Sequence, residues 1–166
     1  MSTEPKKQNL VFTRIFNAPV EQVWRAWTTP EGVMQWWGPD MFSCPFARMD
    51  VRVGGTSIVA MRSPQEFGGG DTYNVWTYEA VEPHRRLVYV LRFSDPDGNV
   101  VAPADLGLPP DMPDEVRNEV TFKALDGGRT ELTVTEYDWP VVPMMEMSKL
   151  GMEQCLDKMA AMLATS

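Results

Sequence analysis

The residue best placed to do chemistry in this sequence is Glu136, at the end of the last predicted strand. Leu132, Val134 and Glu136 share one face of that strand, and the first two should pack inward. A carboxylate at the mouth of an apolar cavity would have a raised pKa and could act as an acid or anchor a ligand. The simpler interpretation, which the sequence favours, is that the strand end is solvated. Arg92 raises the same question, and nothing in the sequence supports a Glu136–Arg92 pair.

The other reactive side chains form no recognisable catalytic or metal-binding group. A nucleophile needs a base within hydrogen-bond reach, and the single histidine, His84, falls in a predicted turn where we expect it to be solvated. Cys44 and Cys155 have no Cys-x-x-Cys spacing, so we expect buried structural thiols. The glycine runs at 54–55 and 68–70 lack the context of a phosphate loop and predict turns. We therefore predict no catalytic residue, no metal and no cofactor.

Methionine is abundant, and six of the 12 methionines fall between Met144 and Met162. Its flexible thioether suits a binding surface that accepts varied partners, and it equally fills gaps in ordinary cores. Both interpretations stay open from composition alone.

Two short helices are predicted near the N-terminus, where four of the six tryptophans fall within residues 24–37. Pro19 suits the first turn of a helix because its missing N–H would have no partner there. Thr28 or Thr29 would cap a second helix running from Pro30 to about Trp37. Gly38-Pro39 would end it.

The rest of the chain reads mainly as strands and one long helix. Alternating apolar residues predict strands at 10–16, 46–53, 56–62, 73–81, 87–93, 116–124 and 130–137. Short turns join most neighbours, which indicates an antiparallel meander. The segment from Val141 to Leu163 predicts a helix with a broad apolar face, and the sheet is the only surface large enough to receive it.

Residues 95–115 break the pattern, with five prolines and two glycines. The segment is long for a hairpin connection. It is either a lid or a mobile insertion, and the sequence leaves the two open.

Composition indicates an ordinary globular protein of 166 residues, with 43% hydrophobic and 23% charged residues. We expect a flexible tail at 1–9 and a single domain at 10–166. The net charge of −8 argues against nucleic acid, and no apolar stretch reaches about 20 residues, so no membrane span is expected. With no signal-peptide pattern, we expect a cytoplasmic protein that is a monomer or a homodimer.

Several motifs together resemble a known family. They are Ala18-Pro19, Val23-Trp24, Trp27-Thr28, Pro30-Glu31, Trp36-Trp37-Gly38-Pro39, Asp50 to Gly55, Tyr78-Glu79 to Pro83, Arg86 to Tyr89, Thr121-Phe122 and Thr130 to Thr133. The chain resembles the AHSA-type family, named for activators of a heat-shock chaperone's ATPase, within the START-like (SRPBCC) superfamily. The resemblance spans Leu10 to Leu163 apart from the proline-rich segment.

The resemblance implies an α+β helix-grip fold: a curved antiparallel sheet of about seven strands around a long C-terminal helix, with two short helices after the first strand. It favours a protein that binds a small apolar or aromatic ligand between sheet and helix. A chaperone-modulating interaction module and a cavity enzyme of the cyclase or hydrolase kind are the alternatives. The candidate cavity residues are Trp37, Trp76, Tyr78, Tyr89, Phe93, Glu136, Met145, Met152 and Met159.

The chain departs from the family pattern at one dipeptide in the C-terminal helix. Members often carry Gly-Trp there, and this chain has Gly151-Met152. We expect the glycine to let the helix approach the sheet. If the tryptophan normally fills part of the interior, the methionine should leave a roomier or softer cavity.

Overall fold

The computed structural model describes residues 6–164, which form one curved sheet with three α-helices. Along the chain the elements are β1 (Lys7–Phe16), α1 (Val20–Thr28), α2 (Pro30–Trp36), β2 (Ala47–Arg48), β3 (Thr56–Arg62), the 3₁₀ turn η1 (Gln65–Phe67), β4 (Asp71–Glu82), β5 (Arg86–Ser94), the 3₁₀ turn η2 (Pro103–Leu106), β6 (Glu115–Leu125), β7 (Arg129–Pro140) and α3 (Pro143–Ala164). The sheet order is β1-β7-β6-β5-β4-β3-β2, antiparallel throughout.

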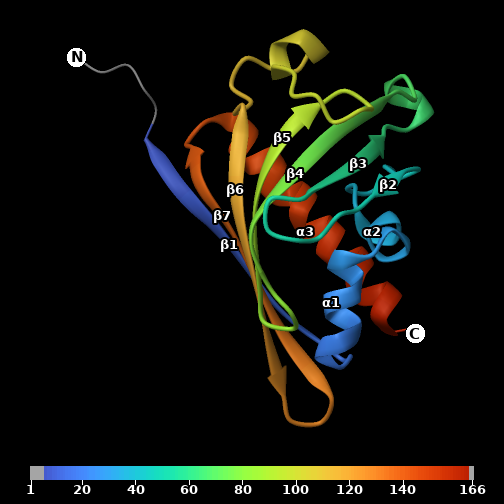
Figure 1. Ribbon diagram of the computed structural model, residues 1–166. Coiled ribbons are helices and arrows are strands. Elements are labelled where there is room, and N and C mark those ends of the chain that lie inside the picture. Colours follow the sequence, from blue (N-terminus) through green and yellow to red (C-terminus); the bar gives the residue numbers. More distant parts are fainter. Residues whose placement is uncertain (1–5, 165–166) are drawn as a thin grey trace.

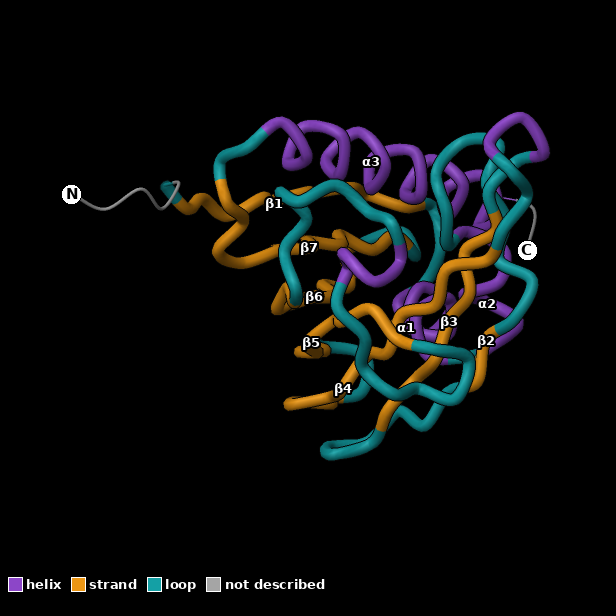
Figure 2. Tube along the Cα trace, turned by 90° about the horizontal axis from the view of Figure 1, so that it is seen from above, coloured by secondary structure: helices purple, strands orange, loops and turns teal. Residues whose placement is uncertain are grey.

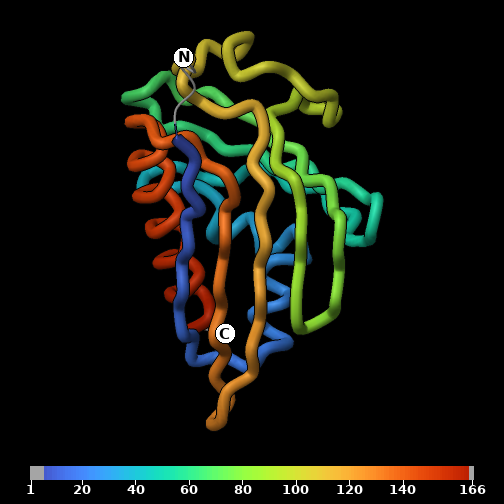
Figure 3. Tube along the Cα trace, turned by 90° about the vertical axis from the view of Figure 1, so that its left-hand side faces the viewer, coloured from blue at the N-terminus to red at the C-terminus, as the bar shows by residue number. Residues whose placement is uncertain are grey.

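The sheet wraps around α3, while α1 and α2 cover its other end (Figure 1). Seen from above, α3 lies along β1 and the strands curve away from it towards β4 (Figure 2). Seen from the left-hand side of Figure 1, no described helix crosses in front of β7 and β6 (Figure 3). This arrangement confirms the predicted helix-grip fold. Of the expected tail at 1–9, residues 1–5 lie outside the described part, and Lys7 to Asn9 belong to β1.

Thr29 explains why two helices follow each other with no linker. Its hydroxyl donates to the carbonyl of Arg25 at 2.8 Å and accepts from the N–H of Gly32 at 3.1 Å. One side chain thus serves the end of α1 and the start of α2. Helix α1 begins at Val20, so Pro19 is its cap rather than part of its first turn.

The predicted strand at 46–53 is wrong beyond its first residues, since only Ala47 and Arg48 pair with β3. The N–H of Arg52 bonds the carbonyl of Asp50 at 3.1 Å, and that of Gly55 bonds the carbonyl of Arg52 at 2.8 Å. The Asp50 carboxylate also accepts from the Arg52 guanidinium at 2.9 Å. These local bonds turn the chain away from the sheet despite its alternating sequence.

The core fills the space between the sheet and the helices. Trp27, Trp36 and Trp76 are fully buried, and Trp76 stacks on Tyr89 with ring centroids 4.6 Å apart. The indole N–H of Trp36 donates to the carbonyl of Ala26 at 2.7 Å and ties α2 to α1. Aromatic side chains therefore fill one end of the interior.

No helix within residues 6–164 is long and apolar enough to cross a membrane.

Candidate functional site

Beyond the fully buried Trp27, Trp36 and Trp76, a cavity of about 360 Å³ lies between α3 and the concave face of the sheet. Three sets of elements line it: strands β3 to β7, helix α3, and the loops that follow α2 and η2. The residues that line it are Trp37, Pro39, Phe42, Met61, Thr72, Asn74, Tyr89, Leu91, Phe93, Leu108, Met112, Pro113, Val116, Asn118, Glu136, Trp139, Met144, Met147, Ser148, Gly151, Met152 and Cys155.

Helix α3 supplies a complete stripe of lining residues. Positions 144, 147, 148, 151, 152 and 155 follow one another by +3, +1, +3, +1 and +3, which places them on one face. The neighbouring stripe, at 145, 152, 156, 159 and 163, is buried in the core. Met152 and Cys155 both line the cavity and are buried with the core, so they lie at the border between the two.

Glu136 lies on the wall of the cavity and is only 6% exposed. The solvated strand end that the sequence favoured is therefore wrong. Its Oε1 accepts a hydrogen bond from the indole N–H of Trp139 at 2.8 Å. Burial raises the pKa of the Glu136 carboxyl to about 7, although the bond from Trp139 works in the opposite direction.

A bulge brings Trp139 to the same side as Glu136, although a regular strand would point the two side chains to opposite faces. Between them Asp138 has a left-handed φ of 58°, and the register with β1 shifts at this point, with Gln8 opposite Trp139 and Leu10 opposite Glu136. The N–H of Asp138 is held by the side chain of Asn9 at 3.0 Å. Bulges near functional sites re-aim side chains in this way.

A polar row crosses the floor of the cavity at this level. Tyr89, Asn118 and Glu136 stand directly opposite one another on β5, β6 and β7. The amide nitrogen of Asn118 donates to the carbonyl of Val116 at 3.1 Å, and that of Asn74 donates to the carbonyl of Arg92 at 3.4 Å. Both amides are buried, so they present fixed polar atoms to an otherwise apolar space.

Arg92 does not approach Glu136. It pairs instead with Glu115 across β5 and β6 at 3.4 Å. None of the described residues that line the cavity is Lys, Arg or His.

The loop before β6 contributes to the wall of the cavity. Leu108, Met112 and Pro113 line it, and the Asp111 carboxylate accepts from the N–H of Met144 at 3.2 Å in the first turn of α3. A carboxylate is favourable at a helix N-terminus because the N–H groups there have no partner within the helix. The proline-rich segment is thus fastened to the helix that forms the opposite wall.

Five of the nine candidate residues from the sequence line the cavity: Trp37, Tyr89, Phe93, Glu136 and Met152. The other four, Trp76, Tyr78, Met145 and Met159, are buried elsewhere in the interior. Trp76 supports Tyr89 from behind, and the hydroxyl of Tyr78 is 2.9 Å from that of Ser57. Sequence reasoning missed Asn74, Asn118 and Trp139. The two asparagines could have been found as polar residues at inward-facing strand positions. The bulge that turns Trp139 inward has no comparable signal in the sequence.

The cysteines and the histidine play no part in a reactive group. Burial raises the pKa of the Cys155 thiol to about 11 and raises that of Cys44, so neither is a thiolate at neutral pH. His84 is exposed in a turn beside Trp24, at a ring distance of 5.9 Å. No group of three potential metal ligands occurs among residues 6–164.

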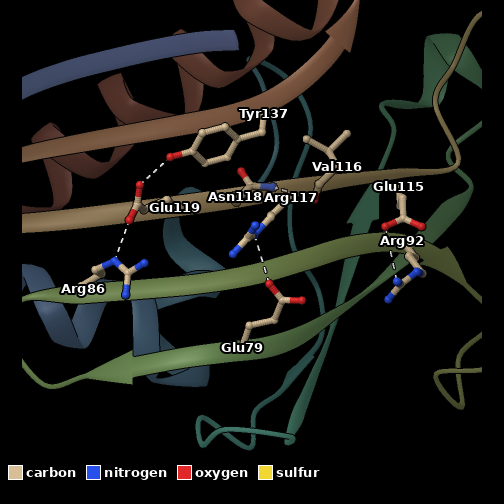
Figure 4. A network of polar contacts seen from close by, with 9 residues as sticks. All are labelled: Glu79, Arg86, Arg92, Glu115, Val116, Arg117, Asn118, Glu119 and Tyr137. Atoms are coloured by element: carbon tan, nitrogen blue, oxygen red, sulfur yellow. Dashed lines mark hydrogen bonds and ion pairs between the residues drawn. The ribbon is translucent and has the colours of Figure 1, made fainter.

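A second, smaller concavity on the outer face of the sheet is filled by mutually paired charges (Figure 4). The Glu119 carboxylate accepts from the hydroxyl of Tyr137 and from the Arg86 guanidinium, both at 2.6 Å. The two contacts hold the pKa of Glu119 below its usual value, the Tyr137 bond contributing most. Arg117 pairs with Glu79 at 3.1 Å. Because these groups satisfy one another, the interior cavity is the better candidate site.

Comparison with known proteins places the chain in a family. A family model described as Activator of Hsp90 ATPase homolog 1-like protein matches residues 17–164, and the chain belongs to this family. The comparison with curated proteins gave no match.

Solved structures support the same fold at low sequence identity. A protein from Chromobacterium violaceum is 24% identical with a TM-score of 0.73, covering 93% of this chain and 96% of its own. A protein from Arthrobacter aurescens is 22% identical with a TM-score of 0.77, and the match covers 95% of this chain and 87% of that protein. A Silicibacter pomeroyi protein named for the same family is 19% identical with a TM-score of 0.73, covering 95% and 99%. At these identities the likeness establishes the fold.

Proposed function

We propose that this protein binds a small, mainly apolar or aromatic molecule in the cavity between α3 and the sheet. The observation that carries the proposal is the cavity itself: about 360 Å³, lined by aromatic rings and methionines, with a few fixed polar atoms. Ligand pockets in proteins commonly enclose about 300–1,000 Å³ and have this mixture of lining groups. The methionine stripe of α3 adds a wall that adapts to the shape of its occupant.

A neutral fluorescent dye, phenylnaphthylamine, tests the proposal by titration. We expect saturable binding of one dye per chain, with emission typical of an apolar site. Met152→Trp adds bulk at the border of the cavity and should weaken binding by about tenfold or abolish it. Leu150→Trp is the matched control, because Leu150 lies on the same helix, is 53% exposed and does not line the cavity.

Two results would contradict the proposal: no saturable binding, or equal dye affinity in both variants and the parent protein. Native mass spectrometry of protein freshly purified from its own host is an independent test, in which a co-purifying mass of a few hundred daltons would support the proposal.

Catalysis in the same cavity is a second candidate, favoured by the burial of Glu136. A carboxyl group with a pKa near 7 is well placed for general acid–base work. Turnover of a bound compound that Glu136→Gln abolishes, with binding and fold intact, would establish an enzyme. The family description also suggests a chaperone-modulating role, which a change in Hsp90 ATPase rate on addition of this protein would support.

A further inference from the structure

The cavity has an uneven set of polar groups. Its walls carry one carboxyl group, Glu136, and the side-chain amides of Asn74 and Asn118, but no basic side chain within the described residues. A buried carboxylate is costly unless a cation or several hydrogen-bond donors compensate it. Glu136 has one such donor, Trp139.

Apart from Trp139, the groups closest to Glu136 make no hydrogen bond to its carboxyl among the described residues. Asn118, its neighbour on β6, directs an amide N–H to the carbonyl of Val116. Tyr89 on β5 and Cys155 on α3 also face the carboxyl, and burial keeps both neutral, raising the pKa of Tyr89 well above its usual value and that of Cys155 to about 11. Leu10 on β1 is apolar. Glu136 is therefore the one group here that ionises between pH 5 and 9.

We propose that the ligand is an apolar amine whose ammonium group pairs with the carboxylate of Glu136 while its hydrocarbon part fills the cavity. This assignment rests on the proposed ligand-binding function. The ammonium supplies both a positive charge and N–H donors, which are what the site lacks. Trp37, Tyr89, Phe93 and Trp139 surround the space with aromatic rings, whose faces attract cations.

Other ligand chemistries fit these walls less well. A carboxylate ligand would place a second negative charge beside Glu136 with no basic residue to offset it. One lining group does favour an acceptor, since the indole N–H of Trp37 is buried without a hydrogen-bond partner in the described structure. A single neutral donor accommodates a carbonyl or ether elsewhere on the ligand, but it does not neutralise a carboxylate.

Three probes of the same shape separate the possibilities: naphthylethylamine, naphthylethanol and naphthylpropionate. Calorimetric titration at pH 8, where Glu136 is ionised, should show that the amine binds about tenfold or more tightly than the alcohol. The propionate should bind most weakly. Affinity for the amine should rise between pH 6 and pH 8, while affinity for the alcohol changes little.

Glu136→Gln is the decisive variant, because it keeps an oxygen for the Trp139 bond and removes the charge. It should lose both the preference for the amine over the alcohol and the pH dependence of amine binding. Equal affinities for amine and alcohol in the parent protein, or an amine preference that survives in the variant, would overturn the amine assignment alone. If none of the three probes binds, the ligand-binding function itself fails, and the assignment falls with it.

Discussion

The burial of Glu136 depends on a local irregularity of β7. The left-handed backbone at Asp138 turns Trp139 inward, and the indole N–H then meets the carboxyl at 2.8 Å. That indole N–H is the one hydrogen-bond donor to the Glu136 carboxyl among the described residues. The bulge therefore places a titratable group and its hydrogen-bond donor together on an apolar wall.

The raised pKa of Glu136 should appear in the stability of the protein. Below pH 4.5 the carboxyl is protonated in both the folded and the unfolded state. As pH rises to about 7, the unfolded state ionises first, so the free energy of unfolding falls, by on the order of 3 kcal/mol in total. Glu136→Gln should remove this fall and be more stable than the parent at pH 8. Urea unfolding at pH 4 to 8 measures both proteins.

Low pH provides the control for this comparison. At pH 4 both side chains are neutral and similar in shape, so the two free energies of unfolding should nearly coincide. Parallel curves across the whole range would show that Glu136 titrates normally in the folded protein.

Sequence reasoning identified Glu136 but favoured the wrong environment for it. The alternation of Leu132, Val134 and Glu136 gives the face of the strand, and the structure agrees. The depth at which a strand leaves the core depends on what covers it, here α3 and the loop before β6. Those contacts join residues far apart in the chain and leave no periodic signal.

Two helical glycines have opposite roles in this fold. Gly32 in α2 lies against α1, where a Cβ atom would come within 2.6 Å of the carbonyl oxygen of Arg25. Gly151 in α3 faces Pro39, and a Cβ atom there would meet it at 3.8 Å, an ordinary contact. The glycine that permits a close approach is therefore Gly32, whereas the sequence had assigned that role to Gly151.

Alanine substitution at the two positions should change stability in opposite directions. Gly32→Ala forces rigid backbone segments apart and should destabilise the protein by about 2 kcal/mol. Gly151→Ala should be neutral or stabilising by up to about 1 kcal/mol, because alanine favours the helix. Thermal and urea unfolding of the two variants provide the measurement, each variant serving as the control for the other. Equal losses would show that α1 and α2 do not pack as described.

The apolar pattern of α3 predicted the helix but not the face that lines the cavity. The strongly apolar stripe at 145, 152, 156, 159 and 163 is the face of α3 that packs into the core. The cavity face includes Ser148 and Gly151 among its methionines, so it carries no comparable apolar period. A hollow requires fewer contacts than a core, and its lining residues are correspondingly harder to identify from hydrophobicity.

At the scale of the whole molecule, the net charge of −8 complements the proposed ligand. A negative protein attracts a cationic ligand before contact, and salt screens that attraction. The amine probe should therefore bind a few-fold more weakly as salt rises from about 0.01 to 0.1 M, where the Debye length falls from roughly 30 to 10 Å.

The uncharged alcohol is the control for this salt series, and its affinity should stay constant. Calorimetry on the parent protein at pH 8 suffices for both probes. An amine affinity independent of salt would mean that only short-range contacts act on the ligand.

The fold itself was largely predictable, because strand alternation, turn glycines and the tryptophan-rich helices each act locally. The resemblance to the family then predicted that these elements form a helix-grip fold. The structure and the family match confirm that prediction. The strand expected at 46–53 failed where hydrogen bonds within 50–55 outweighed pairing with β3. In this segment the alternation of apolar residues did not predict which hydrogen bonds the backbone makes.

The bond between Asp111 and Met144 means that access to the interior has a cost in helix order. If the loop before β6 swings away, the first turn of α3 loses its remote cap, which is worth about 1 kcal/mol in typical helices. That turn carries Met144, which lines the cavity, so the loop and this part of the opposite wall should loosen together. The rates at which a ligand enters and leaves would then depend on fraying at the start of α3 and not on movement of the loop alone.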